Sequence, residues 1–392
     1  MRDKLIISVV ILCCLQATLI FAEHQVELHP IYNKLNQHTG YAAKVMIGEP
    51  KKEFSLLLDT VTAFLLVFPS FHPVAILGGM QTYSGLESRS FNITNIVSLT
   101  QIYGSRIFTV CEHGDNISFD LLHGTHVDFT GSPVHEAGIM IWPKLEDYQK
   151  IDGVLGLSAL HVNGFPYGVF YISSSNIFVM DNLIKKAIRN NELDPVITIA
   201  LPPLDSNKTA ILTLGGRDTQ TCNLNYETTE PFHLSHFLLF RIPPDQSANR
   251  YEFKYNSIKM GNAVSSIASF AYPNTIEPYI GVPYEFLQKI VRNLNATFDL
   301  TRMKYVVKCD RSIPNTFEPF EISTDSNIYI VSPEHFIIKH NPNDTLCELA
   351  FGINESIIFD DPNAVMLGLP FFHQYCVMLE PRDRRINFAP II

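Results

Sequence analysis

Two segments of the sequence, far apart in the chain, share one pattern. The apolar run FSLLL is followed by Asp59, and 97 residues later (156 minus 59) lies Gly156, the second glycine of the motif GVLGL. In the second half, Asn274 is followed 94 residues later (368 minus 274) by VMLGLPF, centred on Gly368. Such self-similarity indicates two units of one plan. With 392 residues the chain is long enough for two cores, because single cores stop growing near about 250–300 residues.

The apolar runs predict strands. Most are short, rich in Val, Ile, Phe and Tyr, and interrupted by Gly, Pro, Asn or Asp, as in YAAKVMIG, FLLVF, VITIAL, AILTLGG and NIYIVSP. Two stretches are typical of helices: residues 181–193, with Asp181 as the N-cap, and residues 283–294, with Pro283 in the first turn. The predicted fold class is therefore all-β, with a few short helices.

The N-terminus predicts secretion. Residues 1–22 combine the basic Arg2 and Lys4 with a long apolar run, which is typical of a signal peptide cleaved after Ala22; a signal anchor is the alternative. Six Asn-x-Ser/Thr acceptor sites agree with a secreted glycoprotein, extracellular or in the lumen of the secretory or lysosomal pathway. They are Asn92, Asn116, Asn207, Asn295, Asn343 and Asn354.

The cysteines predict disulfides and no metal site. Beyond the signal the cysteines are Cys111, Cys222, Cys309, Cys347 and Cys376, a number that predicts two disulfides and one odd thiol in an oxidising compartment. No Cys/His spacing fits zinc, so we expect no metal and no other cofactor.

The formal charge of −10 argues against nucleic acid or an anionic membrane as partner. We expect no membrane association after signal removal, and a monomer.

Several segments together resemble the pepsin family of aspartic peptidases, over nearly all of the mature chain. YAAKVMIGEP at 41–50 is similar to the family's first strand, and FSLLLDT at 54–60 to the strand that delivers the first catalytic aspartate. IDGVLGL at 151–157 and LTLGGRD at 212–218 resemble two further family segments. The long segment at 365–391 resembles the family's closing segment almost throughout.

The resemblance implies a bilobal, double β-barrel fold with a central cleft that holds an extended peptide or protein segment. The lobes would span residues 23–218 and 219–392. The resemblance also implies a disulfide between Cys309 and Cys347. We expect Cys222 and Cys376 to form the second disulfide, which leaves Cys111 odd.

The family's catalytic motif is degenerate here. Aspartic peptidases carry Asp-Thr-Gly-Ser/Thr twice, and the two carboxylates share one proton because like charges about 3 Å apart cannot both ionise cheaply. Here the first motif reads DTVT at 59–62 and the second reads NTIE at 274–277. Asp59 is retained, but Asn274 replaces the second aspartate, and an amide neither ionises nor shares a proton as a carboxyl does.

The other motif positions divide into lost and retained groups. Val61 and Ile276 replace two glycines, and their branched side chains resist the close backbone approach that glycine permits. Thr60 and Thr275 remain, and the resemblance implies that they cross-brace the two lobes by hydrogen bonds. Thr62 keeps the hydroxyl position of the first motif.

The hairpin flap that closes over substrate in this family is harder to place. EHGDNISFD aligns best and puts His113 at the flap tyrosine, whereas IYGSR offers Tyr103 as the alternative. We therefore predict His113 as the flap residue.

The sequence leads to one main hypothesis and two alternatives. The chain is predicted to be a secreted pepsin-like protein that does not cleave peptides, with a vestigial Asp59, and that acts by binding a peptide or protein. The first alternative is an active aspartic-type endopeptidase, proteolytic at acidic pH, in which Glu277 replaces the lost carboxylate, although Pro278 stiffens that loop. The second is different chemistry, for which the neighbours Cys111, Glu112 and His113 form the one local cluster.

Overall fold

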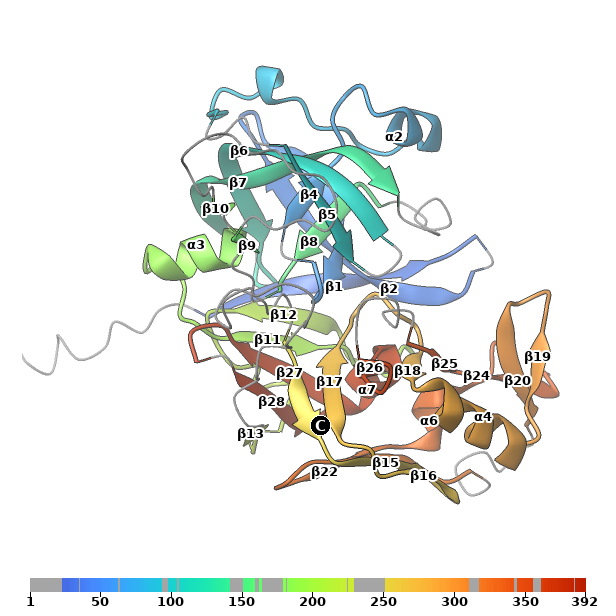
Figure 1. The fold of residues 1–392 in the computed structure, drawn as a ribbon. Helices are drawn as coiled ribbons and strands as arrows, with labels where there is room; N and C mark the ends of the chain where they lie inside the picture. The colour runs from blue at the N-terminus through green and yellow to red at the C-terminus, as the bar shows by residue number, and fades with distance from the viewer. Residues whose placement is uncertain are drawn as a thin grey trace, which may run out of the picture.

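Strands dominate both halves of the chain (Figure 1). The computed structural model describes residues 23–34, 36–62, 64–93, 98–103, 106–141, 151–158, 162–163, 179–180, 182–223, 225–228, 251–309, 317–341, 344–354, 361–383 and 385–392. The expected signal peptide at 1–22, the cap Asp181 and the acceptor site Asn343 lie outside these residues. Among the residues described, no helix is both long and apolar enough to cross a membrane.

The N-terminal half builds a closed ring of six strands. In order around the ring these are β2 (His38–Ile47), β3 (Lys52–Asp59), β8 (Gly153–Gly156), β4 (Leu65–Val67), β7 (His126–Ile141) and β6 (Arg106–Asp120), and pairing of β6 with β2 closes it. Alternate residues of these strands point inward, and Phe54, Phe119 and Phe129 are fully buried there. β5 (Ser98–Tyr103) pairs with the outer part of β6.

The same sheet continues beyond the ring and ties the two ends of the chain together. β2 pairs with β1 (His24–Tyr32), which pairs with β12 (Ala210–Leu214) and through it with β11 (Ile197–Ala200). The C-terminal strands β27 (Tyr375–Glu380) and β28 (Arg385–Pro390) then join β11, with β13 (Glu227–Thr228) at the edge. Figure 1 shows this region, where the last strands lie beside β11 and β12 between the two lobes.

Three smaller sheets make the second lobe. The first contains β14 (Phe253–Tyr255), β17 (Ser269–Pro273), β26 (Val365–Leu367), β18 (Ile280–Val282) and β25 (Phe351–Ile353). The second contains β16 (Ala263–Ser265), β15 (Ser257–Met260), β21 (Phe320–Ser323) and β22 (Ile328–Val331). The third contains β19 (Thr297–Asp299), β20 (Lys304–Lys308), β24 (Leu346–Leu349) and β23 (Ile337–Ile338). Phe388 packs edge-on against Phe253, Tyr329 and Phe371, so the C-terminal strand also anchors this lobe's core.

Short helices fill the connections. They are α2 (Pro73–Gly78), the 3₁₀ turn η1 (Gly85–Glu87), α3 (Leu183–Arg189), α4 (Tyr284–Asn293), α6 (Pro333–Phe336) and α7 (Leu369–Gln374); β9 (Val162–Asn163) and β10 (Val179–Met180) form a separate short pair. Both predicted helices are present. In α3 the cap is Asn182, whose side chain accepts a hydrogen bond from the Lys185 N–H, and in α4 Pro283 is the N-cap itself. The predicted all-β fold of two lobes is confirmed.

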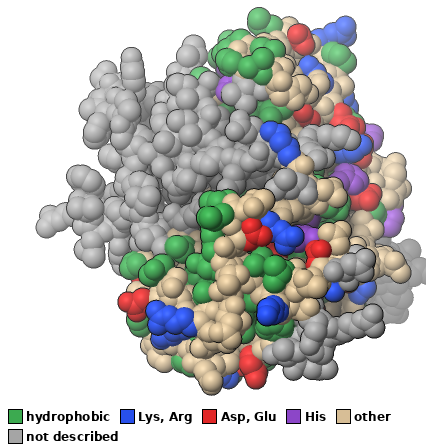
Figure 2. All heavy atoms as spheres, turned by 90° about the vertical axis from the view of Figure 1, so that its right-hand side faces the viewer, with side chains coloured by type: hydrophobic (Ala, Val, Ile, Leu, Met, Phe, Trp, Pro, Cys, Tyr) green, Lys and Arg blue, Asp and Glu red, His purple; other side chains and the backbone are tan. Residues whose placement is uncertain are grey.

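Charge is mixed on the face drawn in Figure 2. Acidic, basic and histidine side chains of the described residues are interspersed there, and no single sign of charge gathers over one element. The described residues on this face therefore form no extended basic surface of the kind that binds a phosphate backbone.

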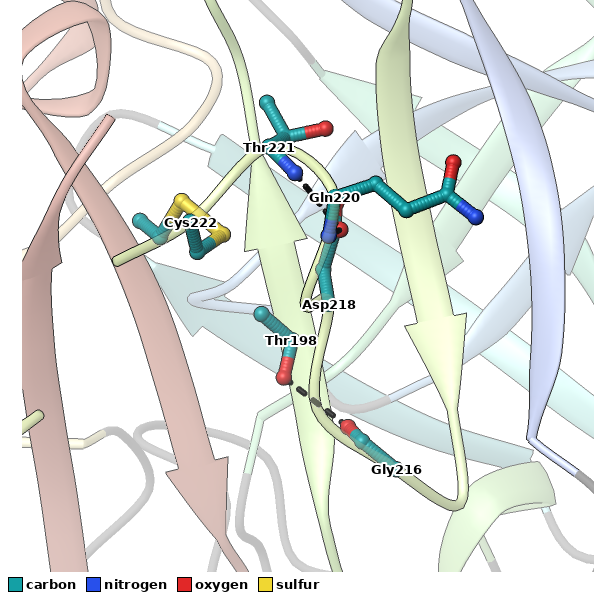
Figure 3. The surroundings of a disulfide bond; sticks show 7 residues. Thr198, Gly216, Asp218, Gln220, Thr221 and Cys222 are labelled. Carbon is teal, nitrogen blue, oxygen red and sulfur yellow. Dashed lines mark hydrogen bonds between the residues drawn. A yellow bond between two sulfur atoms is a disulfide. The ribbon is translucent and has the colours of Figure 1, made fainter. Parts of the chain in front are cut away.

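Two disulfides pin the fold, in the pairs expected from the sequence. Cys309 joins Cys347, and Cys222 joins Cys376, while Cys111 is free. Figure 3 shows how Cys222 is positioned: the buried Asp218 carboxylate accepts hydrogen bonds from the N–H groups of Gln220 and Thr221, at 2.8 and 3.0 Å. This turn aims the chain at β27, which carries Cys376.

Candidate functional site

The two degenerate motifs lie at equivalent places in the two lobes. β3 runs parallel to β8, with Asp59 opposite Gly156. β17 runs parallel to β26, with Pro273 opposite Leu367, so Asn274 follows its strand as Asp59 ends its own. The duplication seen in the sequence is therefore one of structure as well.

The central glycines of both motif pairs allow close packing of these loops. A Cβ on Gly156 would stand 2.4 Å from the carbonyl oxygen of Thr62, and one on Gly368 would stand 2.0 Å from that of Tyr279. Neither approach is possible for a residue with a side chain. The glycines of GVLGL and VMLGL are thus needed for the motif loops to pack this closely, independently of any chemistry at those loops.

Thr60 and Thr275 brace the lobes reciprocally, as the resemblance implied. The Thr60 hydroxyl donates to the Pro273 carbonyl at 2.8 Å, and the Thr275 hydroxyl donates to the Leu58 carbonyl at 2.6 Å. Each hydroxyl oxygen also accepts the backbone N–H of the other threonine, at 3.3 Å. Both residues are buried, so four hydrogen bonds hold the two motif loops in register.

Asp59 is held in the first loop by its own neighbours. Its carboxylate is fully buried and accepts hydrogen bonds from the Val61 N–H at 2.7 Å and from the Thr62 hydroxyl at 2.6 Å. These two hydrogen bonds hold the Asp59 side chain in one orientation.

Asn274 reproduces half of that arrangement in the second loop. Its side-chain oxygen accepts the Ile276 N–H at 3.2 Å, which matches the bond from Val61 to Asp59. Its amide nitrogen lies 3.2 Å from the Met366 sulfur, to which it donates. Glu277 stands where Thr62 stands in the first loop; it is half-buried, and its backbone carbonyl accepts the Leu369 N–H at 2.9 Å.

The residues that replace the two glycines are packed into apolar surroundings. Ile276 is 1% exposed. Val61, from the first lobe, forms a small cluster with Tyr272 and Met366 of the second lobe, and Tyr279 packs against it. An apolar contact therefore crosses between the lobes beside Asp59 and Asn274, where the sequence motif would otherwise have placed bare backbone.

One expected glycosylation site is part of this environment. Asn354 is completely buried: its side-chain oxygen accepts the Tyr272 hydroxyl at 2.9 Å, and its amide nitrogen donates to the Ala364 carbonyl at 3.1 Å. A glycan on that nitrogen is incompatible with this packing, so we now expect Asn354 to carry no glycan in the folded chain. The burial could not be read from the local sequon, because Tyr272 comes from β17 and Ala364 from the residue before β26.

The remaining acceptor sites differ in accessibility. Asn92, Asn207 and Asn295 are exposed. Asn116 is half-buried, and its amide nitrogen donates to Glu49 while its oxygen accepts the Gly131 N–H.

His113, the residue predicted for the flap, is part of a long strand pairing. His113 lies within β6, opposite Val134 of β7, and its ring packs against Phe91, with ring centroids 5.1 Å apart. β5 and β6 pair with each other, and Tyr103 pairs with Arg106 at one end of this ladder. The alternative alignment places the flap residue there, at Tyr103.

The local cluster of Cys111, Glu112 and His113 does not converge. Alternation along β6 directs Glu112 to the face opposite its two neighbours, and there it meets the buried His135, with 3.3 Å between Oε2 and Nε2. Burial raises the pKa of the Cys111 thiol, and the nearby Glu136 adds to the effect, so the reactive thiolate is disfavoured. Sequence reasoning did not single out His135, Tyr272 or Met366. His135 and Tyr272 belong to no motif, and Met366 lies in VMLGLPF, where only Gly368 was singled out.

Comparison with known proteins agrees with this geometry. The family model for eukaryotic aspartyl proteases matches residues 40–391. Pregnancy-associated glycoprotein 2 of Bos taurus is 26% identical over 387 residues, covering 94% of this chain and 86% of that protein. Aspartic protease 6 of Caenorhabditis elegans is 23% identical over 360 residues, covering 89% of this chain and 81% of that protein. With paired motif loops, reciprocal threonines and a family match along nearly its whole length, the chain belongs to the eukaryotic aspartyl protease family.

Proposed function

We propose that this family member binds an extended peptide or protein segment between its lobes and does not cleave it. The observation that carries the proposal is Asn274 at the position equivalent to Asp59. Peptide hydrolysis by this fold needs two carboxyl groups that share a proton, one to activate water and one to polarise the scissile carbonyl. An amide cannot ionise to act as the base, and it cannot share a proton as a carboxyl group does; removing one member of a catalytic unit usually removes most of its rate.

The apolar cluster beside the motif supports the same conclusion. A reacting water has to be held by polar groups on both sides. Here the Val61 side chain meets Tyr272 and Met366, and the Asn274 amide is directed at the Met366 sulfur. These contacts replace polar surroundings with apolar ones at the place where hydrolytic water would be positioned.

Peptide binding would survive the loss of the carboxylate. Extended peptides are bound mainly by main-chain hydrogen bonds and by pockets for alternate side chains, neither of which needs a catalytic dyad. The two disulfides fit an oxidising, secretory compartment, and the formal charge of −10 fits a partner other than nucleic acid. We propose a secreted monomer with lobes divided near residues 218 and 219.

An active acid endopeptidase is the competing function. Glu277 carries the nearest carboxyl group along the second loop, three residues after Asn274, and is only half-buried. Its backbone is fixed by the bond from Leu369, so bringing its side chain to Asp59 requires a rearrangement around Pro278.

One experiment separates the two functions. The purified, secreted protein is incubated with denatured haemoglobin from about pH 3 to about pH 7, with and without pepstatin, and folding is checked at each pH by circular dichroism. Pepstatin binding is measured in parallel by calorimetry, because this peptide analogue reports an intact cleft even without turnover. Asp59→Asn is the matched control, since it changes the retained carboxylate alone.

The outcomes are distinct. We expect no cleavage by the parent chain, and cleavage by a variant that combines Asn274→Asp, Val61→Gly and Ile276→Gly. Cleavage by the parent that pepstatin blocks and Asp59→Asn abolishes would overturn the proposal, and its loss in Glu277→Gln would then identify the substitute carboxyl. A folded parent that neither cleaves nor binds any peptide probe would also contradict peptide binding.

A further inference from the structure

Three histidines from three different elements meet beneath β2. His38 is the first residue of β2, His335 lies in α6 and His373 lies in α7. The rings of His38 and His373 are stacked, with centroids 6.0 Å apart and 15° between planes. The ring of His335 meets that of His373 edge-on at 6.3 Å. The cluster thus links the N-terminal strands to two helices of the second lobe.

Protonation of these imidazoles is unfavourable in the folded chain. The three residues are half-buried, and the Nε2 atoms of His38 and His373 are shielded and have no hydrogen-bond partner among the described residues. A proton on either atom would therefore be neither solvated nor paired. It would also place a positive charge beside the neighbouring imidazole, since the ring centroids of His38 and His373 are 6.0 Å apart.

The groups that face the cluster do not offset this cost. The Tyr41 ring lies 4.7 Å from that of His38, edge-on, and the Tyr32 ring lies 5.8 Å away. Two carboxylates, Glu334 on α6 and Asp205 in the segment before β12, act on His335 and favour its charged form. Gln374 contributes a hydrogen bond to the same ring. None of these acidic or amide groups acts on the stacked pair.

The pKa values follow this geometry. Burial, reinforced by His38 and His335, lowers the pKa of His373 to about 3. Burial lowers the pKa of His38 to about 4, against a hydrogen bond with Gly40 that raises it, and burial also outweighs the two carboxylates and lowers the pKa of His335. The cluster is therefore built to be neutral.

Its arrangement is not that of a metal centre. The rings stack and meet edge-on instead of converging, and the described residues contain no group of three His, Cys, Asp or Glu side chains placed to hold a metal ion.

We propose that His38, His335 and His373 form an acid-sensitive joint, which holds β2 against α6 and α7 near neutral pH and weakens as the pH falls. The sign follows from linkage: the unfolded chain takes up protons at the ordinary histidine pKa of 6.5, whereas the folded joint resists them until a lower pH. The contribution of the three histidines to the free energy of unfolding is therefore fully present above about pH 6.5 and is lost progressively as the pH falls towards about 4. The proposal is independent of whether the cleft hydrolyses peptides.

The test is the pH dependence of unfolding. The folding equilibrium of the full secreted chain is measured by urea denaturation between about pH 7.5 and about pH 4.5. We expect the equilibrium constant to fall by about 10- to 100-fold more in the parent than in His373→Leu, because one imidazole that resists protonation contributes up to about that factor over this range. His123→Gln is the control, since His123 is exposed, and it should follow the parent.

Two results would overturn the joint. The first is a pH dependence of His373→Leu equal to that of the parent and of His123→Gln. The second does not require any variant to fold: nitrogen-15 NMR of histidine-labelled parent protein should show at least two imidazoles that stay neutral from about pH 7.5 to about pH 5. If all imidazoles titrate near their ordinary pKa, the cluster is not a joint of this kind.

Discussion

Replacing Thr60 by valine removes the hydroxyl that links the two motif loops and leaves the shape of the side chain nearly unchanged. The hydroxyl donates to the Pro273 carbonyl at 2.8 Å and accepts the Thr275 N–H at 3.3 Å, and both threonines are buried. A buried group that loses its partner costs about 1–3 kcal/mol, and the longer of the two bonds counts for less. We therefore expect Thr60→Val to lower the free energy of unfolding by about 2–4 kcal/mol.

Thr213 provides the matched control for this change. It is fully buried in β12, yet its hydroxyl has no hydrogen-bond partner among the described residues. Thr213→Val makes the same chemical replacement without breaking a bond, so we expect a change within about 1 kcal/mol, and a stabilising one is reasonable.

The assay is urea denaturation at neutral pH, followed by circular dichroism and intrinsic fluorescence. A double-mutant cycle with Thr275→Val then isolates the coupling, since Thr60 and Thr275 share two of their bonds. If Thr60→Val costs no more than Thr213→Val, or if the two threonine changes are additive, the reciprocal brace does not stabilise the junction and the reasoning is refuted.

Three further predictions follow from individual contacts. Gly368→Ala should prevent folding or lower stability severely, because its Cβ would stand 2.0 Å from a backbone carbonyl, whereas Gly78→Ala, which meets only the Met80 side chain at 3.4 Å, should be close to neutral; the yield of secreted protein and its thermal midpoint check both. Glu348→Gln should cost about 2–3 kcal/mol, because the buried carboxylate pairs with Lys304 and with His340. Burial raises the pKa of Glu348, but these two partners outweigh it and the net pKa is lowered, so the difference between parent and variant should shrink as the pH falls below the ordinary carboxyl range; equal differences at pH 6 and pH 3 would contradict the pairing. Glycopeptide mapping of secreted protein should find glycans at Asn92, Asn207 and Asn295 and none at Asn354, and an occupied Asn354 in folded protein would show that its burial is wrong.

Much of the fold could be predicted because it is encoded locally. Short apolar runs bounded by Gly, Pro, Asn or Asp specify strands, and the glycine-containing motifs specify where two of them pass close to a loop. The threonines of the two motifs and the cysteine pairs were placed correctly, since each belongs to a segment whose neighbours resemble the family.

The local signal that suggested a turn near His113, the predicted flap residue, is misleading. EHGDN has the composition of a turn, yet it lies inside the 15-residue strand β6. The strand pairing shifts register between Asp115 and Ile117, and such an irregularity accommodates turn-forming residues without ending a strand. Only the partner strand β7 reveals this, and it is not readable from the segment itself.

The packing around the motifs could not be predicted for a similar reason. Val61 was recognised as a replaced glycine, but its partners Tyr272 and Met366 are far from it in the sequence, and no local pattern indicates that the three form one cluster. The same holds for Asn354, whose sequon has the ordinary sequence of an exposed acceptor but whose side chain is enclosed by another strand. Contacts of this kind depend on tertiary packing, which local patterns do not contain.

The retention of Asp59 has an explanation that does not involve catalysis. Its carboxylate organises the first loop by accepting the Val61 N–H and the Thr62 hydroxyl, and the buried donors would lose their partner if it were removed. Asn274 keeps the one equivalent bond, from Ile276, because an amide oxygen accepts as a carboxylate oxygen does. At the position equivalent to Thr62 the second loop has Glu277, which has no hydroxyl donor. A second carboxylate oxygen at position 274 is therefore not needed as an acceptor there. Selection for loop geometry alone would thus preserve aspartate at the first position and tolerate asparagine at the second, so the presence of Asp59 is not by itself evidence that the chain cleaves peptides.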